Sequence, residues 1–277
     1  MTYQFVNARD KNTIPIIPIE TAVFKAWLKT QENVMRRWVK SVGFNAEAGS
    51  VSLVAGKDGS FSKVLVGVDE YHGLWAYADL PRRLSEGRFE IDARFDTKGA
   101  TAAAIGWALG FYKFNRYKSK TTNYDFPSLV WPVNCDRSSV RRTVDAIFLI
   151  RDLINTPASD MGPGELAAAT RKLARKHKAT VKVISGKNLL NRNYPTIHAV
   201  GRAADRAPRL IDLTWGRRTH PKVTLVGKGV CFDSGGLDLK SASGMLRMKK
   251  DMGGAAHVLG LSHMIMDAKL KVRLRVL

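Results

Sequence analysis

Residues 226–240 read VGKGVCFDSGGLDLK and overlap the end of a short apolar run, VTLVG, at 223–227. Gly227 and Gly229 bracket Lys228, and Asp233 follows Lys228 after four intervening residues. A short apolar run that ends in glycines predicts a buried strand that opens into a loop. In open α/β sheets, ligands bind beyond the carboxyl ends of the strands. The stretch therefore predicts both an α/β fold and a ligand site.

The sequence on either side of this stretch alternates between helical and strand patterns. Two amphipathic helices are expected, the first ending at N-T-P and the second beginning at a proline, which is favoured in the first turn of a helix. This alternation predicts a mixed or parallel sheet flanked by helices. The expected helices are 138–155, 163–178 and 251–267, and the expected strands are 181–184, 196–200, 210–215, 223–227 and 272–277.

The first half of the chain has its own α/β pattern. Strands are expected at 51–55, 64–68 and 89–95, followed by a helix with small residues on one face at 101–114. The polar stretch 115–125, which is followed by two prolines, favours a domain boundary. We therefore predict two α/β domains, 1–135 and 136–277.

Composition limits the class of protein. The chain has 277 residues, of which 45% are hydrophobic, enough to bury a substantial core. Its two cysteines, Cys135 and Cys231, lie far apart and form neither a disulfide framework nor a cysteine-rich zinc motif, which suits a reducing compartment. The sequence also lacks the apolar run of a membrane span and the pattern of a signal peptide. A cytoplasmic location without membrane attachment is expected.

The net charge of +21 is concentrated in the second half. Residues 1–135 carry 18 basic and 13 acidic side chains, whereas residues 136–277 carry 27 and 11. An acidic partner such as nucleic acid is the functional interpretation, and a solvated basic surface is the structural one. Aromatic residues are not interleaved with these basic residues, and no zinc-finger or RRM pattern occurs. Binding of nucleic acid is therefore expected to be weak, independent of sequence and steeply weakened by salt.

Each part of the stretch has an ordinary structural explanation when taken alone. A glycine-rich phosphate loop is excluded, because neither G-x-x-x-x-G-K-[ST] nor G-x-G-x-x-G occurs. Lys228 between two glycines could be an exposed lysine in a turn, and Asp251 could cap the helix that follows it. The glycines and alanines at 253–256 could serve only for close helix packing.

The combination is much more specific than its parts. The stretch 226–240, followed by M-x-x-M-K-K-D-M-G-G-A-A at 245–256, resembles the metal-binding core of the cytosol leucyl aminopeptidase family. R-D-L-I-N-T-P at 151–157 is similar to the segment that opens the catalytic domain of that family. The resemblance implies a metallo-exopeptidase that uses two divalent metals. It also implies peptide substrates with a free N-terminus, a hexamer, and assignment of 136–277 to the first part of the catalytic domain.

The resemblance implies a role for five residues. Lys228, Asp233 and Asp251 would be metal ligands, with Asp233 bridging the two ions. Lys240 would be a catalytic cation that stabilises the oxyanion formed at the scissile carbonyl. Met248 would line the pocket for the first side chain of the substrate. Carboxylate oxygens with one nitrogen suit Mn²⁺ best, with Zn²⁺, Mg²⁺ and Co²⁺ as alternatives.

Other polar residues near the motif are expected to have no chemical role. Asp238, Lys249 and Lys250 are interpreted as surface charges. His257 and His263 lie on the last predicted helix, and no H-E-x-x-H motif occurs. We expect both histidines to be packed or exposed and not to bind metal.

The sequence departs from the family pattern in one respect. The family's second acidic motif, N-T-D-A-E-G-R, supplies two further carboxylate ligands and an arginine, and it does not occur in the 277 residues. One of the two metal sites would then keep little beyond Asp233. The expectation is a chain that is incomplete at its C-terminus and inactive alone.

Overall fold

The structure is a computed structural model that describes residues 3–119 and 126–277. The chain divides into two compact units, Met1–Val144 and Asp145–Leu277. Part of the polar stretch expected at the domain boundary, residues 120–125, lies outside the described residues. The boundary at 135/136 stays a prediction.

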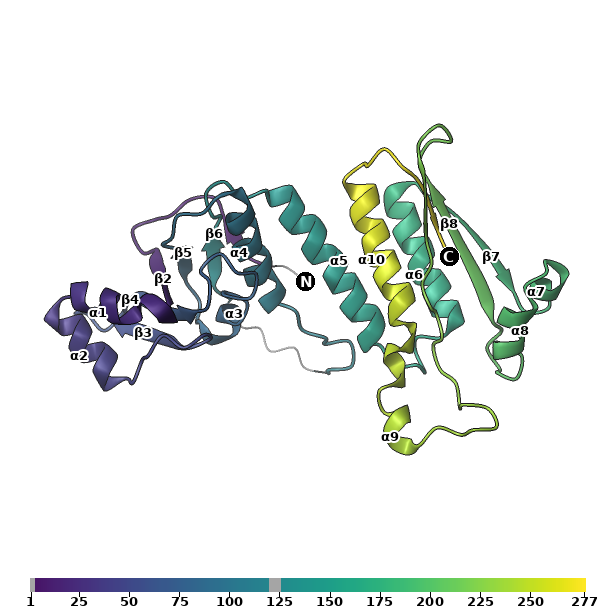
Figure 1. Ribbon diagram of the computed structural model, residues 1–277, viewed down its shortest axis with the longest axis horizontal. Helices are drawn as coiled ribbons and strands as arrows, with labels where there is room; N and C mark the ends of the chain where they lie inside the picture. Colours follow the sequence, from purple (N-terminus) through teal and green to yellow (C-terminus); the bar gives the residue numbers. More distant parts are fainter. Residues whose placement is uncertain (1–2, 120–125) are drawn as a thin grey trace. The chain divides into compact units, whose positions relative to one another are not determined.

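The first unit is built on a six-stranded sheet in the order β1-β6-β5-β2-β4-β3. All neighbouring strands are parallel except β3 and β4, which form an antiparallel pair. The strands are β1 Phe5–Val6, β2 Ile14–Glu20, β3 Val51–Ala55, β4 Phe61–Val68, β5 Arg88–Ile91 and β6 Ser128–Val130 (Figure 1).

Helices connect these strands and help to bury the sheet. The helix expected at 101–114 begins earlier, because Asp96 caps it by accepting a hydrogen bond from the Gly99 backbone N–H at 2.7 Å. Trp107 from this helix and Phe89 from β5 are fully buried in one core cluster. The helical segments are η1 Thr21–Val23, α1 Phe24–Thr30, α2 Asn33–Ser41, α3 Leu80–Arg83 and α4 Thr97–Gly110.

The second unit contains a four-stranded mixed sheet in the order β7-β8-β10-β9. β8 is antiparallel to both β7 and β10, whereas β10 and β9 are parallel. The strands are β7 Thr180–Ser185, β8 Arg209–Trp215, β9 Lys222–Leu225 and β10 Arg273–Val276. The mixed α/β fold expected from the sequence is confirmed, and β9 is the strand from which the 226–240 stretch emerges.

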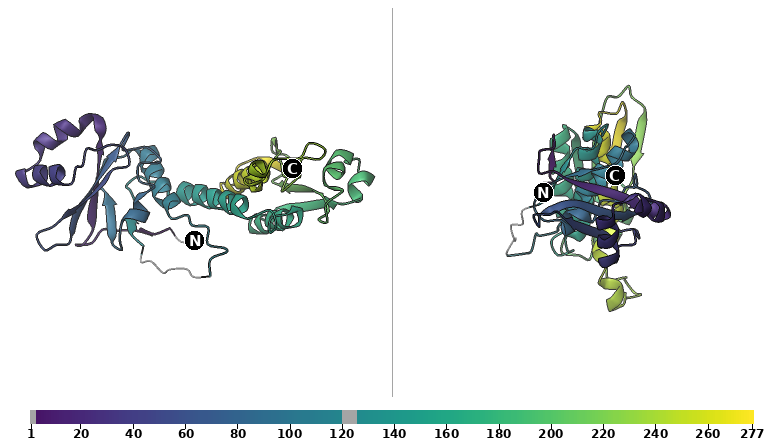
Figure 2. Two further views of the ribbon diagram at one scale, coloured as in Figure 1. Left: turned by 90° about the horizontal axis from the view of Figure 1, so that it is seen from below. Right: turned by 90° about the vertical axis from the view of Figure 1, so that its left-hand side faces the viewer.

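Two long helices of the second unit pack against each other and against the sheet. Figure 1 shows α6 and α10 side by side next to the strands, and Figure 2 shows the same pair from below. Leu166 and Leu173 from α6 and Leu259 and Met266 from α10 are buried in a core that includes Leu274 of β10. α5 Arg137–Asn155 contains residues of both units. The helical segments that follow it are α6 Pro163–His177, α7 Asn188–Asn191, α8 Pro195–Gly201, α9 Ala242–Met245, η2 Met248–Met252 and α10 Gly253–Asp267.

One expected strand is wrong. The short apolar run at 196–200 predicts a strand, but these residues form most of α8. Pro195 occupies the first turn of this helix and Gly201 ends it, which is the usual placement of these two residues in a helix. In the described ranges, the structure contains no helix long and apolar enough to cross a membrane.

Candidate metal centre

Backbone contacts hold the 226–229 loop against the start of α10. The Gly227 N–H donates to the Leu277 carbonyl at 2.9 Å, and the Lys228 carbonyl accepts from the Ala255 N–H at 2.9 Å. The second bond satisfies one of the N–H groups that every helix leaves unpaired in its first turn. The 226–229 loop therefore lies against the first turn of α10. This places Lys228 beside the residues that precede the helix.

Gly227 is required for this close approach. A methyl group at position 227 would lie 2.6 Å from the Gly254 carbonyl oxygen and 2.7 Å from the Ala255 Cα. A methyl group at position 229 would meet only ordinary contacts, 3.6 Å from Leu166 Cδ2 and 3.7 Å from Ala255 Cβ. There is therefore no room for a side chain at position 227, whereas position 229 has room for a methyl group.

This difference predicts unequal effects of two alanine substitutions. Gly227→Ala should lower the free energy of unfolding by about 1–3 kcal/mol, because the added methyl overpacks a backbone contact. Gly229→Ala should change it by less than about 0.5 kcal/mol, as expected for ordinary contacts. Urea unfolding of both variants is the measurement. Equal losses would contradict the assigned role of the Gly227–Gly254 contact.

The close approach of the loop places Lys228 next to Asp251. Lys228 Nζ lies 2.7 Å from Asp251 Oδ1, and Lys250 Nζ lies 3.5 Å from Asp251 Oδ2. The hydrogen bond from Lys228, reinforced by the charges of both lysines, lowers the pKa of Asp251 below its ordinary value. Asp251 is therefore ionised at neutral pH, as a metal ligand must be.

A second ion pair forms within the loop itself. Lys240 Nζ lies 2.6 Å from Asp233 Oδ1, and the Lys240 N–H donates to the Ser234 carbonyl at 3.0 Å. The turn between the two charged residues passes through Gly235 and Gly236, whose φ angles of 95° and 72° lie in the left-handed region that favours glycine. These glycines fold the loop back so that Lys240 returns to Asp233.

Met248 lies beside the second ion pair. Only 2% of its surface is exposed, and its sulfur lies 3.5 Å from the Asp233 backbone nitrogen and 3.7 Å from Lys240 Nζ. Met248 and Asp251 both belong to the short helix η2. This helix therefore contacts Asp233 and Lys240 through Met248, and Lys228 through Asp251.

The donor set can be compared with the needs of a divalent metal. Two carboxylates and one amine match the hard-oxygen and nitrogen ligands that Mn²⁺, Mg²⁺, Zn²⁺ and Co²⁺ accept. Both carboxylates are partly accessible, with 21% of the Asp251 side chain and 34% of the Asp233 side chain exposed. The residue types therefore fit a divalent metal. A bound cation would replace Lys228 and Lys240 as the positive partners of the Asp251 and Asp233 carboxylates.

The other polar residues near the site are exposed, but two of them make contacts. Asp238 and Lys249 are exposed, as expected for surface charges. Lys250 is also exposed, but its contact with Asp251 was not anticipated from the sequence. The contact could have been anticipated because Lys250 directly precedes Asp251 in the sequence. His257 is exposed, and its Nδ1 lies 2.7 Å from the Gly253 carbonyl of its own helix.

Cys231 lies in the same loop, but its side chain is buried. Burial, with a smaller contribution from the charge of Glu165, raises its pKa to about 11. Only about one thiol in ten thousand would then be ionised at pH 7, and the thiolate is the form that binds metals or attacks electrophiles. Cys231 is therefore an inert packing residue at neutral pH.

The raised pKa predicts a steep pH dependence of alkylation. In a Cys135→Ser variant, which leaves Cys231 as the one cysteine of the sequence, the rate with iodoacetamide should rise about tenfold per pH unit between pH 7 and 10. The sign follows because the thiolate fraction grows until pH passes the pKa. A rate that levels off near neutral pH would show that the thiol is activated instead of buried.

Known protein families match both halves of the chain. The family described as "Cytosol aminopeptidase family, catalytic domain" matches residues 148–277, and "M17 aminopeptidase, N-terminal domain" matches residues 14–132. A probable cytosol aminopeptidase of Corynebacterium efficiens is 31% identical over 261 residues, which are 89% of this chain and 51% of the relative. The chain thus spans about half the length of this curated relative.

Solved structures give the same result. The cytosol aminopeptidase of Coxiella burnetii is 46% identical, with a TM-score of 0.89 over 98% of this chain and 59% of the other. The bottromycin maturation enzyme BotP, in complex with Mn, is 29% identical, with a TM-score of 0.77 over 96% of this chain and 58% of the other. The two family matches come from the two domains of one kind of peptidase and leave only short segments of the chain unmatched. The chain belongs to the cytosol aminopeptidase family.

Proposed function

We propose that residues 226–256 supply metal ligands for a metalloaminopeptidase that removes the N-terminal residue of peptides. The observation that carries the proposal is the placement of Asp251 beside Lys228 beyond the carboxyl end of β9, with Asp233 and Lys240 paired in the same loop. Two divalent ions are proposed, with Mn²⁺ as the best fit to the ligands. The BotP structure, a complex with Mn, supports this choice of metal.

The proposed ligand role of Lys228 requires a change of its protonation state. In the structure its Nζ lies 2.7 Å from Asp251 Oδ1 as an ion pair. A lysine amine binds a metal only after it loses its proton, and this loss costs free energy at neutral pH. A dication held by Asp233 and Asp251 would offset this cost. Lys228 is therefore expected to become a neutral ligand only after the two carboxylates hold the metal.

Each remaining residue has a proposed part in the reaction. Bound divalent metals would supply an activated water and a site for the free amino group of the substrate. Lys240 presents an ammonium group beside Asp233, where it can stabilise negative charge on the scissile carbonyl oxygen. Met248 packs under Lys240 and Asp233, and it is proposed to form the floor of the pocket for the first side chain.

The 277 residues alone are expected to lack peptidase activity. Without N-T-D-A-E-G-R, the chain provides Lys228, Asp233 and Asp251 for one ion and only the shared Asp233 for the other. A single carboxylate does not hold Mn²⁺ tightly, and even the better site should be weak because of the cost of neutral Lys228.

A chimera tests this function. The 277 residues would be followed by the segment that comes after the matched region in the Coxiella burnetii enzyme. With Mn²⁺, the chimera should release leucine from a leucyl peptide but not from the same peptide with an acetylated N-terminus, whereas the 277-residue chain should release none. Cleavage of both peptides, or activity of the 277-residue chain after host aminopeptidases are excluded, would contradict the proposal.

Peptides with a free N-terminus are the proposed substrates. A hexameric assembly stays a prediction that follows from the resemblance. A cytoplasmic location stays a prediction that follows from the cysteine usage and from the lack of a signal-peptide pattern. Nucleic-acid binding is the second candidate, and it rests on the basic excess of residues 136–277 alone. Tight binding at physiological salt with a preference for one sequence would favour it.

A further inference from the structure

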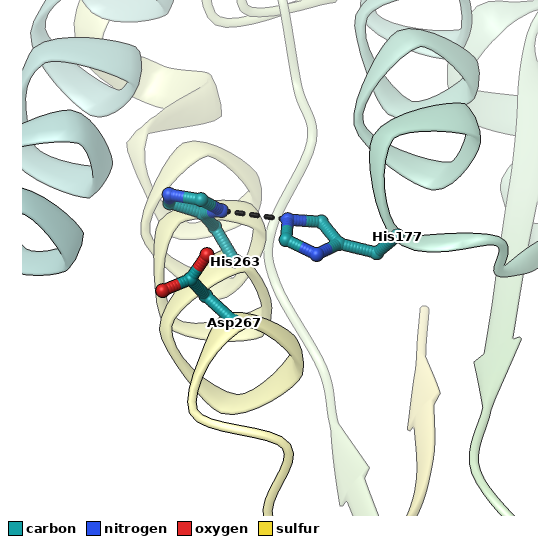
Figure 3. A group of neighbouring side chains, drawn as sticks. All are labelled: His177, His263 and Asp267. Carbon is teal, nitrogen blue, oxygen red and sulfur yellow. Dashed lines mark hydrogen bonds between the residues drawn. The ribbon is translucent and has the colours of Figure 1, made fainter. Parts of the chain in front are cut away.

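A histidine pair connects α6 and α10 outside residues 226–256, the segment that contains the proposed metal ligands. His177 is the last residue of α6, and His263 lies on α10. His177 Nε2 and His263 Nδ1 face each other at 2.8 Å, and the ligand atoms of His177, His263 and Asp267 all lie within 4.8 Å of one another. Figure 3 shows the two rings meeting between the helices, with the Asp267 carboxylate one helical turn from His263.

The fold explains why His177 meets two residues that are distant from it in the sequence. His263 and Asp267 are four positions apart on α10 and therefore share one face of the helix. The two helices lead into β7 and β10, which both run antiparallel to β8 and hence in the same direction. His177, the last residue of α6, thus contacts His263 about one turn before the end of α10, so that both helix C-termini lie near the pair.

We propose that His177, His263 and Asp267 form a binding site for a borderline transition-metal dication, with Zn²⁺ or Co²⁺ as its chemical class. Two imidazole nitrogens and one carboxylate oxygen are a common ligand set for such ions, with water in the fourth position. This site is separate from the ligands in the 226–256 loop and does not depend on their function.

The protonation states suit metal binding. Burial, followed by the charge of Lys176, lowers the pKa of both histidines, so the neutral form of each ring predominates at pH 7. Neutral imidazole is the form that binds a metal. In the hydrogen-bonded pair, one of the facing nitrogens carries a proton. A metal would require that proton to move to the other nitrogen of the same ring, with no net release.

The local charges also favour a cation. Lys176 opposes it, but Lys176 Nζ lies 3.9 Å from Asp145 Oδ2, and both Asp145 and Asp267 act electrostatically on His263. Two helix C-termini add partial negative charge, which stabilises nearby cations.

The geometry requires a small adjustment. A tetrahedral metal at about 2.0–2.1 Å from each nitrogen needs the two nitrogens about 3.3 Å apart. The observed 2.8 Å is the spacing of a hydrogen bond, so the rings must separate by about half an ångström. His263 is 3% exposed and held by its packing, whereas His177 is half-buried at the end of its helix. His177 is therefore the ring expected to move.

A titration with matched variants tests the site. The 277-residue chain would carry Asp233→Asn and Asp251→Asn, so that the ligands of the 226–256 loop do not contribute. Metal-free protein would be titrated with Co²⁺, followed by visible absorption, and with Zn²⁺ in competition with a chromophoric chelator. We expect one equivalent to bind, and His177→Gln or Asp267→Asn to weaken binding at least about tenfold. His257→Gln, on the exposed side of the same helix, should leave binding unchanged.

Thermal unfolding separates metal binding from a purely structural histidine pair. Saturating Zn²⁺ should raise the unfolding midpoint of the parent and of His257→Gln, because a ligand that binds the folded state stabilises it. It should raise that of His177→Gln much less. Both replacements in the site lie outside the deepest core, and circular dichroism would verify folding. Identical Zn²⁺ affinities and midpoint shifts in His177→Gln, Asp267→Asn and His257→Gln would overturn the proposal.

Discussion

Replacing Asp233 with asparagine in the chimera is expected to lower the rate of leucine release at least about a hundredfold. The proposed role of Asp233 is to bridge two metals, whose stabilisation of the transition state amounts to several kcal/mol. A loss of about 2.7 kcal/mol already corresponds to a hundredfold decrease in rate. The measurement is kcat/KM for a leucyl peptide at saturating Mn²⁺.

Asp238→Asn is the matched control for this variant. Asp238 carries the same functional group in the same loop, but it is exposed and no metal role is proposed for it. Its replacement should change kcat/KM less than about threefold, in line with surface substitutions of about 0.5 kcal/mol. Equal losses in the two variants would show that the loop has a structural role only.

Replacing Lys240 with glutamine should reduce kcat about 10²–10³-fold and leave KM nearly unchanged. An interaction made with the developing oxyanion acts in the transition state and adds little to binding of the substrate. Glutamine keeps much of the side-chain length but removes the charge that now lies 2.6 Å from Asp233. Steady-state kinetics of the chimera separate the two parameters.

Lys249→Gln controls for the loss of a positive charge near the site. Lys249 is exposed on η2, next to the buried Met248. Its replacement should alter kcat less than about threefold. If the Lys240 variant instead raised KM alone, Lys240 would bind substrate without stabilising the oxyanion.

Much of the second unit could be predicted from local sequence signals. Pro163 begins α6, α5 ends at the asparagine of N-T-P, and the apolar runs at 210–215 and 223–227 overlap β8 and β9. These segments carry strong periodicity or clear start and stop residues. The α/β class was predictable because such signals recur along the chain.

Other elements could not be predicted because tertiary packing overrides local preference. β2 contains Pro15 and Pro18, which argue against a central strand, yet it lies between β5 and β4 and pairs with both. Its apolar side chains Ile16 and Ile19 are buried on the two faces of the sheet, in two different core clusters. That burial outweighs the hydrogen bonds lost at the prolines.

The candidate site was only partly visible in the sequence. The roles of Lys228, Asp233 and Asp251 came from family resemblance, since spacing alone allowed a helix cap and an exposed lysine. The contact between Lys228 and Asp251 depends on the absence of side chains at Gly227 and Gly254, which brings the loop against α10. Likewise, the sequence predicts only that His263 is packed or exposed, because its partner His177 lies 86 residues earlier at the end of another helix.

Metal dependence of the chimera tests most directly whether the 226–256 loop belongs to a metallopeptidase site. Leucine release from a leucyl peptide would be measured before exhaustive chelation, after it, and after Mn²⁺ is returned. We expect activity to disappear with the metal and to return with Mn²⁺, and Asp233→Asn to prevent that return. Full activity in the chelated protein would contradict the assignment of Lys228, Asp233 and Asp251 as metal ligands.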